Sequence, residues 1–284
     1  MIPGHCLQPV NKALVCRKRN LYISHENNCK SGVRASPSAC YVHGERHDIY
    51  NELAMKNATA NKRSFTPAQI GKLNEEYKDL SVNHRIKQLY EDFEADEIML
   101  TSSFAATSAL LLREFSLVNR DQIIYFIDTG YHFEDTLKYK TLLSDIYGLN
   151  VFSIQADEYE HNFTTEDETW RKNPEFCCSI NKVQPLDKIK ERYSVWVSGL
   201  MEWQSDHRAT LNIFEDRGGI LKFYPLLDIS KEDRENYIRE NKLPFHPLVD
   251  QGYQSIGCKH CTVPGEDRSG RWNNHPKTEC GLHL

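Results

Sequence analysis

Cysteines carry most of the chemistry that this sequence suggests. Cys177 and Cys178 are adjacent, Cys258 and Cys261 form a C-x-x-C pair, and Cys280 stands alone near the C-terminus in K-T-E-C-G-L-H. Two pairs of thiols can supply four ligands to a metal centre, whereas a lone thiol close to a chain end has little core to fill. The pattern therefore separates a metal-holding set from a single reacting cysteine on a tail.

The two cysteine pairs favour an iron–sulfur cluster, although the residues alone leave alternatives open. Four thiolates suit either a cluster or zinc. Structural zinc sites usually use two knuckles in which two to four residues separate the cysteines, and an adjacent pair does not match that spacing. Buried cysteines also serve as small apolar residues, and a C-x-x-C alone can be a redox pair. The odd total of nine cysteines makes a disulfide framework the weakest interpretation.

The neighbours of Cys280 favour its ionised form. Lys277, His275 and His283 lie within five residues of it. Positive charge stabilises the thiolate, which is the nucleophilic form of cysteine. From the sequence alone, an incidental tail cysteine explains the pattern equally well.

A polar stretch between an expected strand and an expected helix is a candidate anion site. Residues 101–108 read T-S-S-F-A-A-T-S. The N–H groups at a helix start attract phosphate or sulfate, and hydroxyls add donors. The stretch lacks the glycines and lysine of a P-loop, and a simple capped polar loop is the plainer interpretation. The hydroxyls belong to Ser102, Ser103, Thr107 and Ser108.

Four basic residues could complete such an anion site. A guanidinium fork matches the oxygens of sulfate and phosphate. Taken singly, each of these residues is explained as well by an ordinary surface charge. They are Lys182, Arg208, Arg268 and Arg271.

The elements that must position these residues alternate between strands and helices. Short apolar runs predict strands at 98–100, 123–127, 151–154, 195–197 and 221–224, and helical periodicity predicts helices from Thr66-Pro67, around 86–93, and at 105–115, 134–147, 180–192 and 230–241. Alternation of this kind predicts an α/β fold with a parallel sheet flanked by helices. Three expected strands end in small polar residues, and functional loops of such sheets lie at these ends.

Length and composition fit one large α/β domain with an extension. The chain has 284 residues and a formal charge of −5, which gives no reason to expect nucleic acid. No apolar run approaches the roughly 20 residues that cross a bilayer, and no signal peptide is recognisable, so we expect a cytoplasmic protein away from membranes. Residues 1–60 lack periodicity and are expected to be poorly ordered, before a domain at 61–284 whose tail is 262–284.

Seven stretches resemble the assimilatory adenylyl-sulfate (APS) reductases and their relatives, the 3′-phosphoadenylyl-sulfate (PAPS) reductases. The similarity covers residues 64–284, and the combination of paired cysteines with a terminal E-C-G-L-H is its most specific part. The stretches are T-S-S-F-A-A-T-S-A (101–109), D-T-G-Y-H-F (128–133), C-C-S-I-N-K-V-Q-P-L (177–186), S-G-L-M-E-W-Q-S-D-H-R-A (198–209), H-P-L-V-D-Q-G-Y-Q-S-I-G-C-K-H-C-T (246–262), R-S-G-R-W (268–272) and K-T-E-C-G-L-H (277–283).

The resemblance implies a fold, a cofactor and a reaction. The fold is that of the adenine-nucleotide α-hydrolases, related to PP-loop enzymes, with a catalytic tail. A 4Fe-4S cluster is implied at Cys177, Cys178, Cys258 and Cys261. Cys280 is implied to attack the sulfur of adenylyl sulfate, releasing AMP and leaving an S-sulfonate from which a thioredoxin-type dithiol frees sulfite. The resemblance also implies that the four hydroxyl residues of the 101–108 stretch and the four basic residues named above contact the substrate. It adds five further contacts: Phe104, Thr129, Gly130, Gly199 and His283.

Several positions depart from the family pattern. Ala105 stands where glycine is usual, Met201 and Glu202 replace commonly basic residues, and Asn181 replaces a frequent arginine. The segment from Cys261 to Arg268 is also shorter than usual. Alternatives to an APS reductase are therefore a PAPS or dual-specificity reductase, or an inactive iron–sulfur redox sensor. An ATP-using PP-loop ligase is disfavoured because the first loop lacks a double glycine and an aspartate. The sequence leaves open whether the protein is a homo-oligomer.

Overall fold

A computed structural model describes residues 62–272, 275, 277 and 279–282. Contacts divide the chain into one unit at Met1–Glu52 and a second at Leu53–Leu284, and every described residue belongs to the second. The expectations for residues 1–60 and for His283 lie outside the described residues. The expected boundary at residue 60 stays a prediction.

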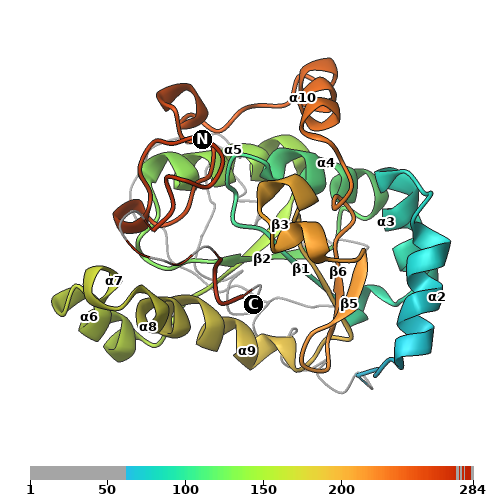
Figure 1. Cartoon of the computed structure of the whole chain (residues 1–284), viewed down its shortest axis with the longest axis horizontal. Coiled ribbons are helices and arrows are strands. Elements are labelled where there is room, and N and C mark those ends of the chain that lie inside the picture. Colours follow the sequence, from blue (N-terminus) through green and yellow to red (C-terminus); the bar gives the residue numbers. More distant parts are fainter. Residues whose placement is uncertain (1–61, 273–274, 276, 278, 283–284) are drawn as a thin grey trace, which may run out of the picture. The chain divides into compact units, whose positions relative to one another are not determined.

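A six-stranded sheet in the order β3-β2-β1-β4-β6-β5 forms the centre of the second unit (Figure 1). All neighbouring pairs are parallel except β5 with β6. The expected parallel sheet is confirmed, and β5, which the sequence did not predict, adds an antiparallel edge strand because Gly218 and Gly219, both at positive φ, close a tight turn that folds it back onto β6. The strands are β1 (Ile98–Thr101), β2 (Ile123–Ile127), β3 (Asn150–Ile154), β4 (Val195–Val197), β5 (Phe214–Asp216) and β6 (Leu221–Phe223).

The helices follow the predicted order with two shifts. The helix expected at 105–115 begins only at Ser108, and the one expected at 180–192 is divided by a π-helical turn at Ser179–Val183. No helix in the described part of the chain is long and apolar enough to cross a membrane. The helices are α2 (Pro67–Tyr77), α3 (Val82–Asp92), α4 (Ser108–Val118), α5 (Glu134–Tyr147), α6 (Glu158–Glu166), α7 (Thr169–Lys172), α8 (Pro174–Cys178), α9 (Gln184–Lys190) and α10 (Lys231–Glu240).

The strands bury both faces, because helices cover the sheet on each side. Along β1, Ile98 and Leu100 join the core beneath α4 and α5, whereas Met99 between them joins a second core with Leu186 of α9. Figure 1 shows α4 and α5 on one side of the sheet and α8 and α9 on the other. This layering leaves the carboxyl ends of the strands as the edge where loops converge.

Burial of His246 gives the stability of the fold a measurable pH dependence. Its Nδ1 accepts a hydrogen bond from the Leu248 N–H at 3.2 Å, and its Nε2 contacts the Thr136 hydroxyl at 3.0 Å. Desolvation lowers the pKa of His246 from 6.5 to about 4. As pH falls below 6.5 the unfolded chain binds a proton that the folded chain excludes. We expect this group to lower the free energy of unfolding by about 2 kcal/mol between pH ~7.5 and pH ~5.

Urea unfolding at the two pH values measures this effect. His246→Asn is the matched control, because asparagine keeps an acceptor near the Leu248 N–H and does not titrate. The wild-type protein should lose more stability than the variant on acidification. Equal losses in the two proteins would contradict the assignment.

Candidate active site

A cavity of about 220 Å³ opens at the carboxyl ends of the central strands. The strand order reverses between β1 and β4, since β2 and β3 lie on one side of β1 while β4, β6 and β5 lie on the other. Ligands of open α/β sheets bind at this kind of switch point. The loops after β1 and β4 both line the cavity, together with segments from the C-terminal quarter of the chain.

The structure brings together most of the residues that the sequence singled out. The cavity is lined by Ser102, Ser103, Thr107, Ser108, Thr129, Lys182, Gly199, Arg208, Arg268, Arg271, Cys258 and Cys280. Two predicted contacts do not line it. Phe104 is fully buried and packs against Phe126 with ring centroids 5.7 Å apart. Gly130 faces the ring of His161, which lies 2.6 Å from where a Cβ would stand.

The loop after β1 lines the cavity and leads into α4. The Ser102 N–H continues the sheet to the Tyr125 carbonyl at 3.0 Å, and the Ser102 hydroxyl accepts from the Phe104 N–H at 3.2 Å. Phe104 adopts a φ of 49°, which turns the chain towards α4. Thr107 precedes α4 without a side-chain capping bond. The first N–H groups of this 11-residue helix therefore lack a capping side chain and favour an anion.

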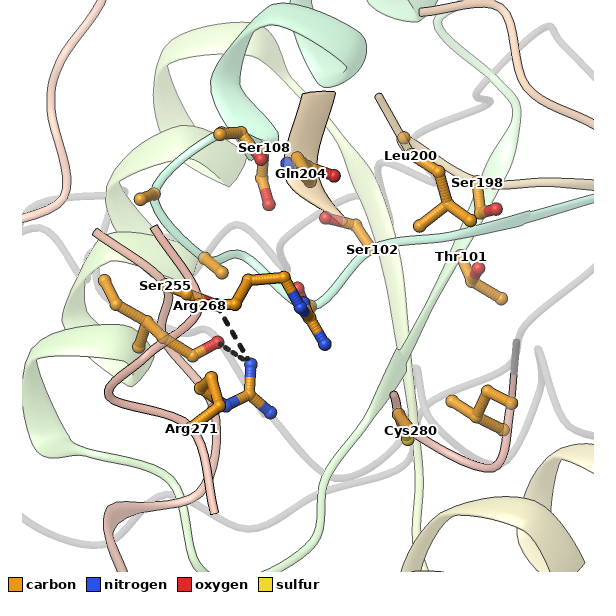
Figure 2. Close-up of a pocket in the computed structure, with 18 of the residues that line it drawn as sticks. Thr101, Ser102, Ser108, Ser198, Leu200, Gln204, Ser255, Arg268, Arg271 and Cys280 are labelled. Carbon is orange, nitrogen blue, oxygen red and sulfur yellow. Dashed lines mark hydrogen bonds between the residues drawn. The ribbon is translucent and has the colours of Figure 1, made fainter. Parts of the chain in front are cut away.

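Arg271 reaches into the cavity from the opposite side. Its Nη1 donates to the Ser255 hydroxyl and the Ile256 carbonyl, both at 3.3 Å, as the dashed lines in Figure 2 show. The guanidinium lies over Gly257, where a Cβ would stand only 2.4 Å from Nη2. Its Nε is buried and has no hydrogen-bond partner among the described residues. Arg271 is thus fixed in direction, and its guanidinium adds positive charge to the cavity wall.

Cys280 lies across the cavity from Arg268 and Arg271 (Figure 2). A hydrogen bond with the Cys178 thiol, the charge of Lys182 and the Leu282 backbone N–H hold the pKa of Cys280 well below that of a free thiol, although burial opposes them. The pKa of the Cys178 thiol changes in the opposite direction, because the hydrogen bond with Cys280 and burial both raise it. Within the cavity, the charge of Lys182 favours the thiolate form of Cys280.

The four paired cysteines come from two segments that the fold holds together. Cys177 and Cys178 end α8, and a bridge between His132 and Cys258 ties the C-x-x-C turn to the loop after β2. Cys177 and Cys258 pack together around Tyr131, with Cys261 against them, while the Cys178 thiol turns to Cys280. All five cysteines of the described residues are free thiols.

The donor set fits an iron–sulfur cluster. The thiols are soft ligands, and the charge of Lys182 acts on Cys177, Cys178, Cys258, Cys261 and Cys280 alike. Burial raises the pKa of Cys177 to about 11, so the thiols need an added cation to be held as thiolates. Among the described residues, no three Cys, His, Asp or Glu side chains lie close enough to share one metal ion. A cluster of four irons is wider than a single metal ion, so the cysteines that bind it lie further from one another than the ligands of one ion do.

The family departures have local explanations. Asn181 is buried, and its amide donates to the Cys177 carbonyl at 3.1 Å and to Thr164 at 3.0 Å, which fixes the first cysteine pair. Met201 is fully buried in the main core, and neither it nor Glu202 lines the cavity. Ala105 lines the cavity and packs beside Ile256 and Leu248. The two positions at which the family commonly has basic residues, 201 and 202, therefore do not line the cavity in this protein.

Glu279, which the sequence analysis did not single out, accepts four hydrogen bonds from described residues. Its carboxylate accepts from Arg208 Nε and Nη2, both at 3.0 Å, from Arg268 Nη2 at 3.1 Å and from the Ser205 hydroxyl at 2.7 Å. The two arginines hold the pKa of Glu279 low against the effect of burial. The signal that could have found it is its position directly before Cys280.

Comparison with known proteins decides the family. The sequence profile of the phosphoadenosine phosphosulfate reductase domain matches residues 97–264, more than half of the chain. The chain belongs to this reductase family. Within the family it is similar to the adenosine 5′-phosphosulfate reductase of Mesorhizobium japonicum, with 40% identity over 66% of this chain and 77% of the relative.

Two further relatives of this family member support the assignment. The adenosine 5′-phosphosulfate reductase 2 of Bacillus subtilis is 35% identical over 70% of this chain and 87% of its own length. The crystal structure of phosphoadenylyl-sulfate reductase from Candida auris, a phosphate complex, matches with a TM-score of 0.62 and 26% identity, covering 72% of this chain and all of that one. The expected α/β fold of this family is confirmed.

Proposed function

We propose that this family member reduces adenylyl sulfate to sulfite and AMP, with Cys280 as the nucleophile. The observation that carries the proposal is the thiol of Cys280 in the same cavity as the open N-terminus of α4 and Arg271. A sulfonucleotide has an anionic phosphosulfate, which suits these donors. The relatives named adenosine 5′-phosphosulfate reductase support the choice of substrate.

The first step is attack of the Cys280 thiolate on the sulfur of the bound nucleotide. The bond between sulfur and the bridging oxygen breaks, and its electron pair leaves with AMP. The cysteine is left as an S-sulfonate. Donors that already point into the cavity, from Arg271 and the loop after β1, would stabilise the charge that grows on the leaving phosphate.

A separate dithiol of the thioredoxin type would complete the cycle. One of its thiolates attacks the Cys280 sulfur, sulfite leaves, and a mixed disulfide forms. The second thiol of the reductant then displaces Cys280 as a thiolate. The dithiol supplies both electrons and ends as a disulfide, so the balance requires no other reductant.

The paired cysteines would hold the 4Fe-4S cluster. When bound, the cluster would keep these four thiols ionised and set the charge around Lys182, as electrostatic and structural support. Lys182 lines the cavity and lies beside both the cluster ligands and Cys280. Its ammonium would position and stabilise the anionic groups on the cavity side.

The proposal is tested by assaying both nucleotides in the presence of a thioredoxin and its reductase: APS would release sulfite and AMP, and PAPS would release sulfite and adenosine 3′,5′-bisphosphate. We expect turnover of APS and a preference for APS over PAPS. Turnover of PAPS alone would replace APS with the substrate named for the Candida auris reductase. No sulfite from either nucleotide by iron-loaded protein would overturn the proposed reaction.

A further inference from the structure

The tail around Cys280 is attached to the domain on both sides of the cysteine. On one side, the Glu279 carboxylate lies between Arg208 and Arg268 and is 1% exposed. On the other side, Lys222 Nζ of β6 donates to the Leu282 carbonyl at 2.6 Å. Cys280 and Gly281 are the only residues between these two attachment points. The backbone on each side of Cys280 is therefore fixed.

Each of the three guanidinium nitrogens of Arg208 donates one hydrogen bond, two of them to the tail and one to a neighbouring side chain. Nε and Nη2 form a bidentate pair with the Glu279 carboxylate, and Nη1 donates to the Gln204 side chain. Its side chain is 7% exposed and that of Glu279 is fully buried. A buried carboxylate needs such partners, since leaving it unpaired costs several kcal/mol. Arg208 is thus paired with an internal anion, whereas the side-chain hydrogen bonds of Arg271 go to the Ser255 hydroxyl and the Ile256 carbonyl.

Lys222 is an unusual partner for a tail carbonyl. Its residue is 2% exposed, and its Nζ lies 4.1 Å from the centroid of the Trp196 ring. Among the described residues, the Leu282 carbonyl is the hydrogen-bond acceptor that the structure gives to this ammonium. Undocking of the tail would expose the cavity side of Trp196 and leave the buried Lys222 amine, whose pKa is lowered to about 7 by burial, without its hydrogen-bond acceptor.

We propose that Glu279 and Lys222 are positioning residues that hold Cys280 at the cavity, and that Arg208 acts through Glu279 rather than on the nucleotide. The inference rests on the proposed function for its kinetic consequences. Its structural part, a tail docked at two points, does not depend on that function. The phosphosulfate is then left to Arg271, Lys182 and the loop after β1.

Alkylation of Cys280 tests the docked tail without any use of the activity. We expect Glu279→Gln and Lys222→Met each to accelerate modification of Cys280 by iodoacetamide on the order of tenfold, measured on the tail peptide by mass spectrometry, because the free tail exposes the thiol. Glu134→Gln is the matched control, since Glu134 forms an exposed ion pair with Lys138 at 2.7 Å. Unchanged alkylation in both tail variants would overturn the two-point attachment.

Kinetics test the role of Arg208. We expect Glu279→Gln and Arg208→Gln each to slow single-turnover AMP release at saturating APS by about 10- to 100-fold, while APS affinity, measured in a Cys280→Ser background, changes less than about threefold. The double variant should be no slower than the worse single variant, because both remove one contact. Loss of APS affinity in Arg208→Gln but not in Glu279→Gln would overturn the inference. Absence of AMP release in the wild-type protein would instead contradict the proposed function.

Discussion

Replacement of Cys280 by serine should abolish sulfite production. A serine hydroxyl has the shape of the thiol but is ionised far less readily, and the cavity around Cys280 is arranged to stabilise a thiolate. We expect the rate of sulfite release from APS to fall by about 10³-fold or more. The measurement is steady-state release of sulfite and AMP with a thioredoxin present in excess.

A cysteine that the sequence pattern does not assign to the site provides the control for this substitution. Cys16→Ser makes the same chemical change at one of the four cysteines that precede residue 62. It should keep both iron and activity. Substantial sulfite release by the Cys280→Ser protein would show that another group is the nucleophile, and the tail would then have a purely structural role.

Replacement of Cys258 by serine should remove the metal centre. Its Sγ lies 3.3 Å from the Thr129 hydroxyl and packs beside Cys177, so it links the loop after β2 to the cysteine site. Because folding and cluster retention are coupled through such ligands, we expect the purified variant to retain at least about tenfold less iron than the wild-type protein. Iron and acid-labile sulfide, measured on anaerobically prepared protein, give a readout independent of turnover.

The metal analysis also separates the cluster from zinc. About four irons and four sulfides per wild-type chain are expected for the cluster. One zinc per chain, lost in Cys258→Ser, would replace the cluster with a zinc site. Full iron content in the variant would contradict the assignment of Cys258 as a ligand, and Cys16→Ser again serves as the control.

The sequence predicted the central strands because they are buried on both faces and read as apolar runs. β1, β2 and β4 lie where these runs predict them. β5 was missed because it is a three-residue edge strand, Phe-Glu-Asp, with one fully apolar residue. The start of α4 was placed too early because a left-handed turn at Phe104 has no signal in composition.

The residues of the site were easier to predict than their partners. Arg208 and Arg268 were recognised as anion contacts from their type, and the structure shows that both bind an anion. That anion is Glu279, which is 71 residues from Arg208 in the chain. Hydrophobic periodicity describes only neighbouring residues, so it cannot predict a contact between residues this far apart. Lys222 was missed for the same reason, since its contact with the Leu282 carbonyl joins residues 60 positions apart.

The central claim is that Cys280 takes the sulfonate group from adenylyl sulfate. Intact mass spectrometry of anaerobically purified protein, exposed to APS or separately to PAPS without a thiol reductant, tests it most directly. We expect one sulfonate adduct from APS, absent in Cys280→Ser and removed by a dithiol. No adduct from either nucleotide, on protein that retains its iron, would contradict the account.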